Sequence, residues 1–466
     1  MKLLRGAILA LAMVASALPA SAQDAACRLD AVPCCDWPAK TVSAQPAPPA
    51  FGTQVWPATL VQSPASVDRL LALKPHHLRF SLGPSWRRQP ALRQEMSDTE
   101  LDMAVAAGFA TMTNADRHAA VMRDIVARSR TKLHLIIWEP PPLPGEPDFT
   151  KPKAPTWRVM KPENVSLAAR FYVAHLKAIA EAGVPLDAVE LSNEPDGSWA
   201  IKILPADYLA LVRAVRGEAK RRGVALPRIF GPGTGRIAEA QPFFRDKAIA
   251  LGILDAVDVV SLHAWDDAAG MDRSAELDKL LARFAELGRK PEIAITEFGV
   301  GRPDILDKTQ RMNARNRGDD NIGLTEAYAG YSTRDLMRLY AGKVGIVIQW
   351  EFQDQSWGKG SMGLLDVKGQ EKPVYRAMRT LAERLDADRP DAIETSPDGR
   401  VALLRKAGRD SLIVSNPSRE PLDIMLANRK PAASKPAAGI ATCAGTSGTG
   451  LRLPAESVTA IPLAPH

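Results

Sequence analysis

Two glutamates of this chain, Glu194 and Glu297, lie in sequence settings that suit acid–base chemistry. Glu194 follows a strand-type segment, residues 189–191, and stands between Asn193 and Pro195. Pro195 lacks a backbone donor and disfavours a helical conformation at the residue before it, so the carboxyl should be fixed where a strand ends. A glutamate there, beside an amide, suits protonation of a leaving oxygen while the amide binds substrate hydroxyls.

Glu297 ends a second run of strand-forming residues, 293–296, and precedes Phe298 and Gly299. Two carboxyl groups about 5 to 5.5 Å apart make a retaining glycosidase, in which one is the nucleophile and the other is first the acid and then the base. A wider gap admits a water molecule and gives inversion. The chemistry therefore depends on whether the fold brings Glu194 and Glu297 together.

Strand-like and helix-like segments alternate along most of the chain. The expected strands are residues 51–61, 76–82, 132–138, 188–194, 228–231, 257–263, 292–297 and 344–350. The expected helices are residues 66–73, 115–129, 163–182, 205–222, 239–251, 273–287, 325–341 and 374–385. Apolar strands that alternate with amphipathic helices imply a parallel sheet covered by helices, and eight such units predict a closed (β/α)8 TIM barrel.

The pattern divides the chain into four parts. Residues 1–22 have a basic start, an apolar run and a small-residue ending, which is typical of a secretory signal peptide. Residues 23–49 read as an N-terminal wrap or linker, residues 50–387 as the catalytic barrel, and residues 388–466 as a small C-terminal antiparallel, sandwich-like β-domain. We therefore expect a secreted or periplasmic protein.

The four cysteines, Cys27, Cys34, Cys35 and Cys443, predict two disulfides in an exported chain. Their distribution implies that at least one disulfide joins the two ends of the chain, and that the N-terminal segment packs on the C-terminal domain. The connectivity stays open. Free thiols or a zinc site are alternatives, although the spacing lacks paired zinc-ligand motifs.

Composition argues against several classes of partner. The formal net charge is +7 without a concentrated basic tract, so we expect no nucleic acid. The N-terminal apolar run is too short to span a bilayer and no later stretch is long enough, so we expect no membrane span. The strand ends carry no clustered His/Asp ligand set, and we expect neither a metal nor a cofactor in what we take to be a monomer.

In such a barrel, reactive side chains lie where the strands end. The strand ends offer Arg79, Trp138, Glu139, Asn193, Glu194, His263, Trp265, Glu297, Gln349, Trp350 and Glu351. Arg79 is expected to keep Glu297 ionised, whereas a less charged setting would keep Glu194 protonated. Glu139, Glu351 and the deeper Glu190 are rival acids.

Aromatic and basic residues point to a carbohydrate, with structural alternatives. Trp86, Trp138, Trp199, Trp265, Trp350 and Trp357 lie at or after strand ends and could stack on sugar rings, or could be ordinary half-buried tryptophans. The long polar segment of residues 299–324, with Arg302, Arg311 and Arg315, reads as a lid that contacts an acidic polysaccharide, or as a solvated loop.

The motifs around the two glutamates resemble those of the clan A retaining glycoside hydrolases, most closely families 30 and 39. The resemblance rests on Leu191-Ser192-Asn193-Glu194-Pro195, on Ile295-Thr296-Glu297-Phe298-Gly299 and on Trp138-Glu139-Pro140-Pro141. It implies an acid/base role for Glu194, a nucleophile role for Glu297, 2-hydroxyl binding by Asn193, and support from Arg79 and His263.

The sequence departs from that pattern after the sixth strand. Many clan A members carry a tyrosine after the histidine, and here the run is His263-Ala264-Trp265. Orientation of the nucleophile by a phenol from this position is therefore not expected, and Tyr328 or Tyr331 are the candidates to reach in from the long loop.

These features predict an exported retaining glycoside hydrolase that cleaves β-glycosidic bonds of a polysaccharide or oligosaccharide by double displacement. A transglycosidase that remodels an exopolysaccharide would use the same residues with a sugar acceptor in place of water. A third possibility is a barrel that binds carbohydrate without catalysis.

Overall fold

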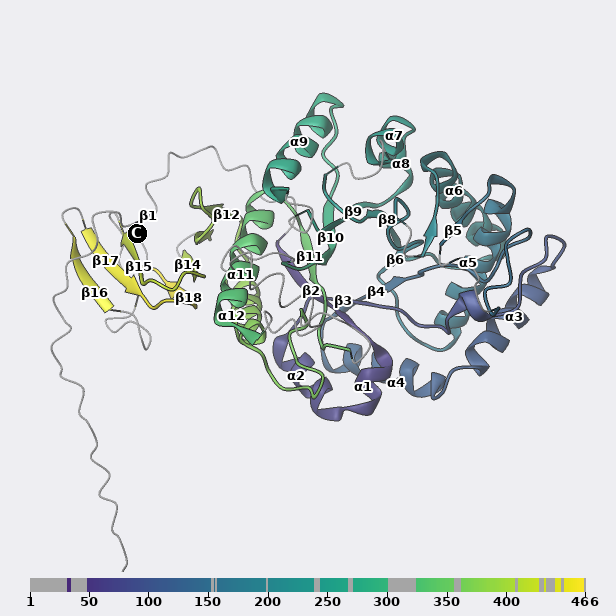
Figure 1. Ribbon diagram of the computed structural model, residues 1–466, viewed down its shortest axis with the longest axis horizontal. Coiled ribbons are helices and arrows are strands. Elements are labelled where there is room, and N and C mark those ends of the chain that lie inside the picture. The colour runs from purple at the N-terminus through teal and green to yellow at the C-terminus, as the bar shows by residue number, and fades with distance from the viewer. Residues whose placement is uncertain are drawn as a thin grey trace, which may run out of the picture.

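The computed structural model describes residues 32–34, 48–151, 155, 157–197, 200–238, 244–266, 271–300, 324–355, 362–406, 410–426, 431–432, 441–445 and 448–464. Eight parallel strands close into a barrel (Figure 1). In chain order they are β2 (Ala50–Val55), β3 (His77–Phe80), β4 (Lys132–Ile136), β6 (Ala188–Glu190), β8 (Arg228–Thr234), β9 (Val259–Ala264), β10 (Ile293–Phe298) and β11 (Ile346–Gln349). The predicted barrel is confirmed.

Helices surround the barrel strands (Figure 1). They are α1 (Pro57–Gln62), α2 (Pro64–Leu73), α3 (Asp98–Ala110), α4 (Ala115–Arg128), α5 (Val165–Glu181), α6 (Pro205–Arg222), α7 (Phe244–Ala250), α8 (Ile253–Ala256), α9 (Arg273–Glu286), α11 (Glu326–Ala341) and α12 (Pro373–Asp388). Short 3-10 turns occupy Trp86–Arg88 and Pro162–Asn164. Within the described residues, none of these helices combines the length and apolar character that a membrane crossing requires.

Two helical segments differ from the sequence expectation. The first barrel strand ends at Val55, not at residue 61, because Pro57 begins α1 at a position that favours proline. Helix α3 was not expected, since it buries few side chains and shows little apolar contrast. Its start is fixed by a capping box in which Ser97 and Glu100 satisfy each other's backbone donors.

The barrel interior changes from apolar to polar along the strands. Side chains two residues apart share a face of a strand, so Ala188 and Glu190 both point inward, as do Val259 and Ser261. Ala188 and Val259, the apolar residue of each pair, form a buried layer near the strand starts together with Phe230. Polar side chains therefore collect toward the carboxyl ends of the strands, where barrel enzymes place reactive groups.

The C-terminal region forms two four-stranded sheets. One contains β12 (Ala392–Thr395), β13 (Val401–Arg405), β14 (Ser411–Asn416) and β18 (Ser457–Pro462); the other contains β1 (Val32–Cys34), β15 (Leu422–Leu426), β16 (Ala441–Gly445) and β17 (Gly448–Leu453). Alternate apolar residues of these strands build a separate core that includes Val401, Leu412, Ile424 and Leu451. The predicted small antiparallel β-domain is confirmed, with β1 added as a parallel strand beside β15.

This domain packs against the barrel through α11 and α12 (Figure 1). Ser415 donates a hydrogen bond to the carbonyl oxygen of Gly330 in α11. A Cβ atom at Gly330 would lie 3.0 Å from the backbone of Pro417, so a side chain there would press on the β-domain. The predicted signal peptide, Cys27 and Cys35 lie outside the described residues, and the disulfides stay a prediction.

Candidate active site

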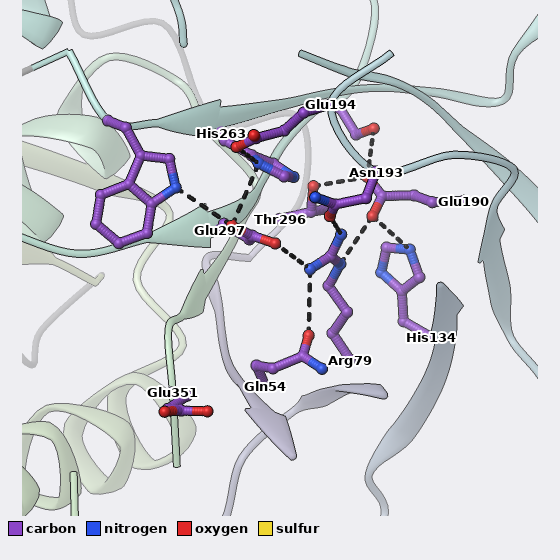
Figure 2. A network of polar contacts seen from close by, with 12 residues as sticks. Gln54, Arg79, His134, Glu190, Asn193, Glu194, His263, Thr296, Glu297 and Glu351 are labelled. Carbon is purple, nitrogen blue, oxygen red and sulfur yellow. Dashed lines mark hydrogen bonds and ion pairs between the residues drawn. The ribbon is translucent and has the colours of Figure 1, made fainter. Parts of the chain in front are cut away.

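Arg79 lies at the centre of a buried polar network at the carboxyl ends of the strands (Figure 2). Its Nε donates to Glu190 at 2.8 Å, and its Nη2 donates to the amide oxygen of Asn193 at 2.8 Å. Nη1 donates to Glu297 at 2.6 Å and to Gln54 at 3.2 Å. Burial alone would lower the pKa of Arg79, but the two carboxylates outweigh it and raise that pKa.

Glu190 is the fully buried counter-charge of Arg79. Besides Arg79, it accepts hydrogen bonds from Ser261 at 2.7 Å and Thr296 at 2.6 Å. Burial opposes ionisation, yet Arg79, together with the neighbouring histidines and these donors, lowers the pKa of Glu190 to about 2. This rival acid therefore stays ionised, and we assign it a positioning role rather than proton transfer.

Glu297 reaches the network because β10 is irregular. Ile295 pairs with Leu262 and Glu297 pairs with His263, so Thr296 is an extra residue in the ladder. In a regular strand Thr296 and Glu297 would point to opposite faces, whereas here both contact the barrel interior. The bulge thus aims the candidate nucleophile at Arg79.

Glu194 has a left-handed backbone conformation, with φ of +46°. Few non-glycine residues adopt it, and such strain clusters at functional sites. The Glu194 N–H donates to the carbonyl oxygen of Gly233. A Cβ atom at Gly235 would lie 3.2 Å from the Glu194 carboxyl carbon, so a glycine leaves room for this carboxyl.

His263 joins the two candidate acids. Its Nδ1 lies 2.9 Å from Glu194 Oε1 and 3.3 Å from Glu297 Oε2 (Figure 2). Burial would lower the pKa of His263, but Glu297 and Glu194 outweigh that effect and raise it. One oxygen of each acid and one ring nitrogen all lie within 4.8 Å of one another.

The same three side chains could also hold a metal ion by geometry. Against that use, the guanidinium of Arg79 lies 2.6 Å from Glu297 and would be an immediate neighbour of the cation. The charge pattern favours a pair of acids with one positively charged partner over a metal centre.

Trp265 contacts Glu297 in a way that the sequence did not predict. Its indole Nε1 donates to Glu297 Oε2 at 3.2 Å. An indole N–H from the segment after β9 thus contacts the candidate nucleophile. The hydroxyl of Tyr328 lies 3.5 Å from the carbonyl oxygen of Met362.

Trp138 and Trp350 lie at the same mouth, grouped around Trp56. The rings of Trp56 and Trp138 are stacked with centroids 6.4 Å apart, and Trp350 meets Trp56 edge-on at 6.0 Å. All three are partly exposed. Trp86, by contrast, is buried against Phe171 and is a core residue.

Two further acids differ in their partners. Glu139 pairs with Arg87 at 2.9 Å and with Arg158 at 3.1 Å, so this rival acid has a structural role. Asp196 accepts a hydrogen bond from the backbone N–H of Gly235, and burial raises the pKa of Asp196 to about 6.

Trp199, Trp357 and residues 301–323 of the expected lid lie outside the described residues.

Sequence reasoning brought together Arg79, Asn193, Glu194, His263, Trp265 and Glu297, which the structure places in one cluster. It missed Gln54, Trp56, Ser261 and Thr296 as partners. A signal existed for some of them, because polar residues inside an apolar strand must find partners when the strand is buried.

Neither a search of protein-family models nor a search of curated protein sequences gave a match. Solved structures do match. A glycoside hydrolase family 30 subfamily 8 xylanase from Clostridium acetobutylicum is 15% identical, with 91% of this chain and 98% of that one covered and a TM-score of 0.58. A family 39 β-xylosidase from Caulobacter crescentus is 16% identical, with 91% and 98% covered and a TM-score of 0.53.

An endo-β-1,6-glucanase is similar in the same way, at 14% identity, with 91% of this chain and 92% of that one covered and a TM-score of 0.57. The chain therefore shares the fold of glycoside hydrolases of families 30 and 39. The resemblance read from the two glutamate motifs is confirmed at the level of the fold.

Proposed function

We propose that this protein is a retaining glycoside hydrolase that cleaves β-glycosidic bonds. The observation that carries the proposal is the pairing of Glu194 and Glu297, whose facing carboxyl oxygens lie within 4.8 Å. Retaining enzymes separate their carboxyl groups by about 5 to 5.5 Å and inverting enzymes by about 6.5 to 9.5 Å. A spacing this short supports the retaining arrangement, in which Glu297 itself attacks the sugar.

The two acids have different surroundings, which supports different roles. Glu297 is held by the Arg79 guanidinium, which stabilises a carboxylate. Glu297 would attack the anomeric carbon and form a covalent ester while the glycosidic C–O bond breaks. Glu194 would give its proton to the departing oxygen in the same step.

In the second step Glu194, now a carboxylate, takes a proton from a water molecule that attacks the anomeric carbon and releases Glu297. His263 lies between both carboxyl groups, with its Nδ1 close to an oxygen of each, and would position the two acids relative to each other. Asn193 offers an amide to the sugar 2-hydroxyl, since Arg79 fixes its oxygen. Two inversions give net retention.

The similar structures support a β-linked carbohydrate substrate, because their names describe xylanase, β-xylosidase and endo-β-1,6-glucanase activities. We propose export to the periplasm or the medium on the basis of the leader-like residues 1–22. Cell fractionation with an antibody, together with N-terminal sequencing of the mature chain, tests this part.

The catalytic roles are tested on an activated aryl β-glycoside. Glu297→Gln should abolish turnover, with a loss of at least about 10^4-fold, because no covalent intermediate forms. Glu194→Ala should slow turnover by about 10^2 to 10^4-fold. Azide should restore the rate of Glu194→Ala and give a β-glycosyl azide, but should not rescue Glu297→Gln.

Product analysis separates hydrolysis from transfer. Hydrolysis in water gives a free sugar of β configuration at the first measurable time, whereas a transglycosidase gives longer products that increase with added sugar acceptor. An α-configured first product, or azide rescue of neither variant, would contradict the retaining assignment. Absence of turnover on any glycan would favour a binding barrel.

A further inference from the structure

A further carboxyl group lies at the barrel mouth outside the Arg79 network. Glu351 is the second residue after β11, is 6% exposed, and lies apart from the network (Figure 2). Trp56 donates its indole N–H to Glu351 Oε2, and within the described part of the chain no other side chain donates to this carboxyl. An ionised carboxyl has about four acceptor positions, so most of its capacity is left for a ligand.

Aromatic rings surround this carboxyl. Trp56, which holds Glu351, is also the ring that stacks on Trp138 and meets Trp350 edge-on. The three rings come from the ends of β2, β4 and β11 and are partly exposed. Small-molecule sites combine such apolar walls with a few fixed polar groups, and the apolar C–H face of a sugar ring fits this kind of wall.

The position in the barrel relates this group to one of the two acids. Strand β11 is the neighbour of β10, which carries Glu297. The backbone N–H of Trp350 donates to the backbone carbonyl oxygen of Phe298 at 2.8 Å. Glu194 follows β6, which lies opposite β11 in the ring of strands. Glu351 is therefore on the nucleophile side, where the sugar that becomes bonded to Glu297 must lie.

Among the described residues, the charges that act most strongly on Glu351 are two carboxylates, Asp354 and Glu297, and one cation, Lys372. Burial is the main reason why the pKa of Glu351 is raised to about 7. The carboxylates of Asp354 and Glu297 also raise this pKa, whereas the hydrogen bond from Trp56 and the charge of Lys372 lower it. Lys372 is itself bonded to Asp354. Near neutral pH such a carboxyl can accept a hydrogen bond from a sugar hydroxyl or donate one, but a ligand carboxylate would meet like charges.

We propose that Glu351, with Trp56, Trp138 and Trp350, forms the subsite for the sugar that Glu297 attacks, and that this subsite takes an uncharged sugar and rejects a uronic acid. The inference rests on the proposed glycosidase function and names the substrate class of that same site. Glu351 binds hydroxyl groups of the ring, and the tryptophans cover its apolar face. The basic residues that suggested an acidic polysaccharide lie in residues 301–323, outside the described chain.

The test compares aryl β-xyloside, β-glucoside and β-glucuronide, which differ only at C5 of the sugar. The wild type should prefer the better neutral glycoside over the glucuronide by at least about 100-fold in kcat/KM at pH 8. Glu351→Gln keeps the shape but removes the charge, and should narrow this ratio by about 10-fold or more. For the neutral glycoside, it should raise KM by about 10-fold with little change in kcat.

A matched control removes a carboxylate elsewhere on the same rim. Glu95 lies in the β3–α3 connection, and its side chain is 72% exposed. Glu95→Gln should leave unchanged both the preference for the neutral glycoside over the glucuronide and the KM for the neutral glycoside. The preference of the wild type for the neutral glycoside should also be smaller below pH 7, where Glu351 is protonated, and Glu351→Gln should remove this pH dependence. Preference for the glucuronide, or an unaltered ratio in Glu351→Gln, overturns the proposal.

A binding measurement keeps the subsite testable if catalysis fails. Absence of turnover by the wild type on every glycoside would count against the proposed function. Tryptophan fluorescence titration with cellobiose and with its uronic acid analogue would then still report on the subsite. Tighter binding of cellobiose, lost in Glu351→Gln, supports the subsite, and equal binding of both sugars overturns it.

Discussion

Glu190 and Glu351 are two buried carboxyl groups in one barrel, and they are held in opposite ways. Glu190 receives an ion pair from Arg79 and hydroxyl donors from Ser261 and Thr296, and its pKa falls to about 2. Glu351 receives one indole N–H, and burial raises its pKa to about 7. Both are almost inaccessible to solvent, so burial does not decide which charge state survives.

The difference shows that the number and charge of donors decide the state of a buried acid. The Glu190 side of the mouth is a fixed electrostatic frame that orients Arg79 toward Glu297. The Glu351 side is under-satisfied by the protein and therefore open to a hydroxylated ligand. In the function that we propose, the Glu190 side positions the nucleophile and the Glu351 side binds the sugar.

The largest expected effect follows from removing Arg79. Arg79→Met leaves Glu190 as an uncompensated buried charge, and should cost about 3 to 5 kcal/mol in the free energy of unfolding. Loss of the contact to Glu297 should also lower kcat/KM by about 10^2-fold or more. Urea unfolding and aryl glycoside kinetics measure the two effects.

The control for this prediction is the double variant Arg79→Met/Glu190→Gln. It removes both charges, so it should recover much of the lost stability but none of the lost activity. If the double variant is less stable than Arg79→Met alone, then Glu190 is not coupled to Arg79 and the proposed frame is wrong.

A second effect separates the two carboxyls by the pH dependence of stability. Between about pH 2 and its ordinary pKa of 4.5, Glu190 is ionised in the folded protein but protonated in the unfolded chain. Stability from Glu190 is thus present above pH 4.5 and lost as the pH falls, by about 3 kcal/mol.

Glu351 has the opposite sign. Between its ordinary pKa of 4.5 and about 7 it is protonated in the folded protein and ionised in the unfolded chain, so stability falls as the pH rises through this range. Glu351→Gln should therefore raise Tm at pH 8 more than at pH 4, and Glu190→Gln should lower Tm at pH 6 more than at pH 2. If a variant shifts Tm equally at both pH values, the charge state proposed for the residue that it replaces is wrong.

The smallest effect compares the two indole donors. Trp265→Phe removes the N–H that holds Glu297 and should lower kcat by about 10 to 100-fold, the value of a charge-assisted hydrogen bond. Trp56→Phe removes the N–H that holds Glu351 and should raise KM instead. Steady-state kinetics at constant pH distinguish the two, and a common effect on KM alone would show that Trp265 only contacts sugar.

Most of the fold could be predicted because apolar strands and amphipathic helices alternate with different periods. The rule that barrel chemistry lies at strand ends then selected Glu194, Glu297, Arg79 and His263. Helix α3 escaped this reasoning because its exposed and buried faces differ little in polarity. Its capping box was a local signal that apolar periodicity does not detect.

The partners within the site were harder to predict, for geometric reasons. Thr296 reaches Glu190 only because β10 contains an extra residue, and a bulge is not visible in the period of the strand. Trp265 was expected either to stack on sugar or to be an ordinary half-buried tryptophan, and neither expectation included the hydrogen bond from its indole N–H to Glu297. Glu190 and Arg79 come from distant segments, and barrel closure brings them into contact.

The pairing of Val32 with Ile424 has a consequence for how the protein is made. Strand β1 is synthesised before the barrel, but its partner β15 appears only after the entire barrel has been synthesised. The second sheet must therefore be assembled late, by an early segment that waits for its neighbour. A truncated protein that starts after residue 47 would leave the edge of β15 uncovered and ready to pair with another molecule.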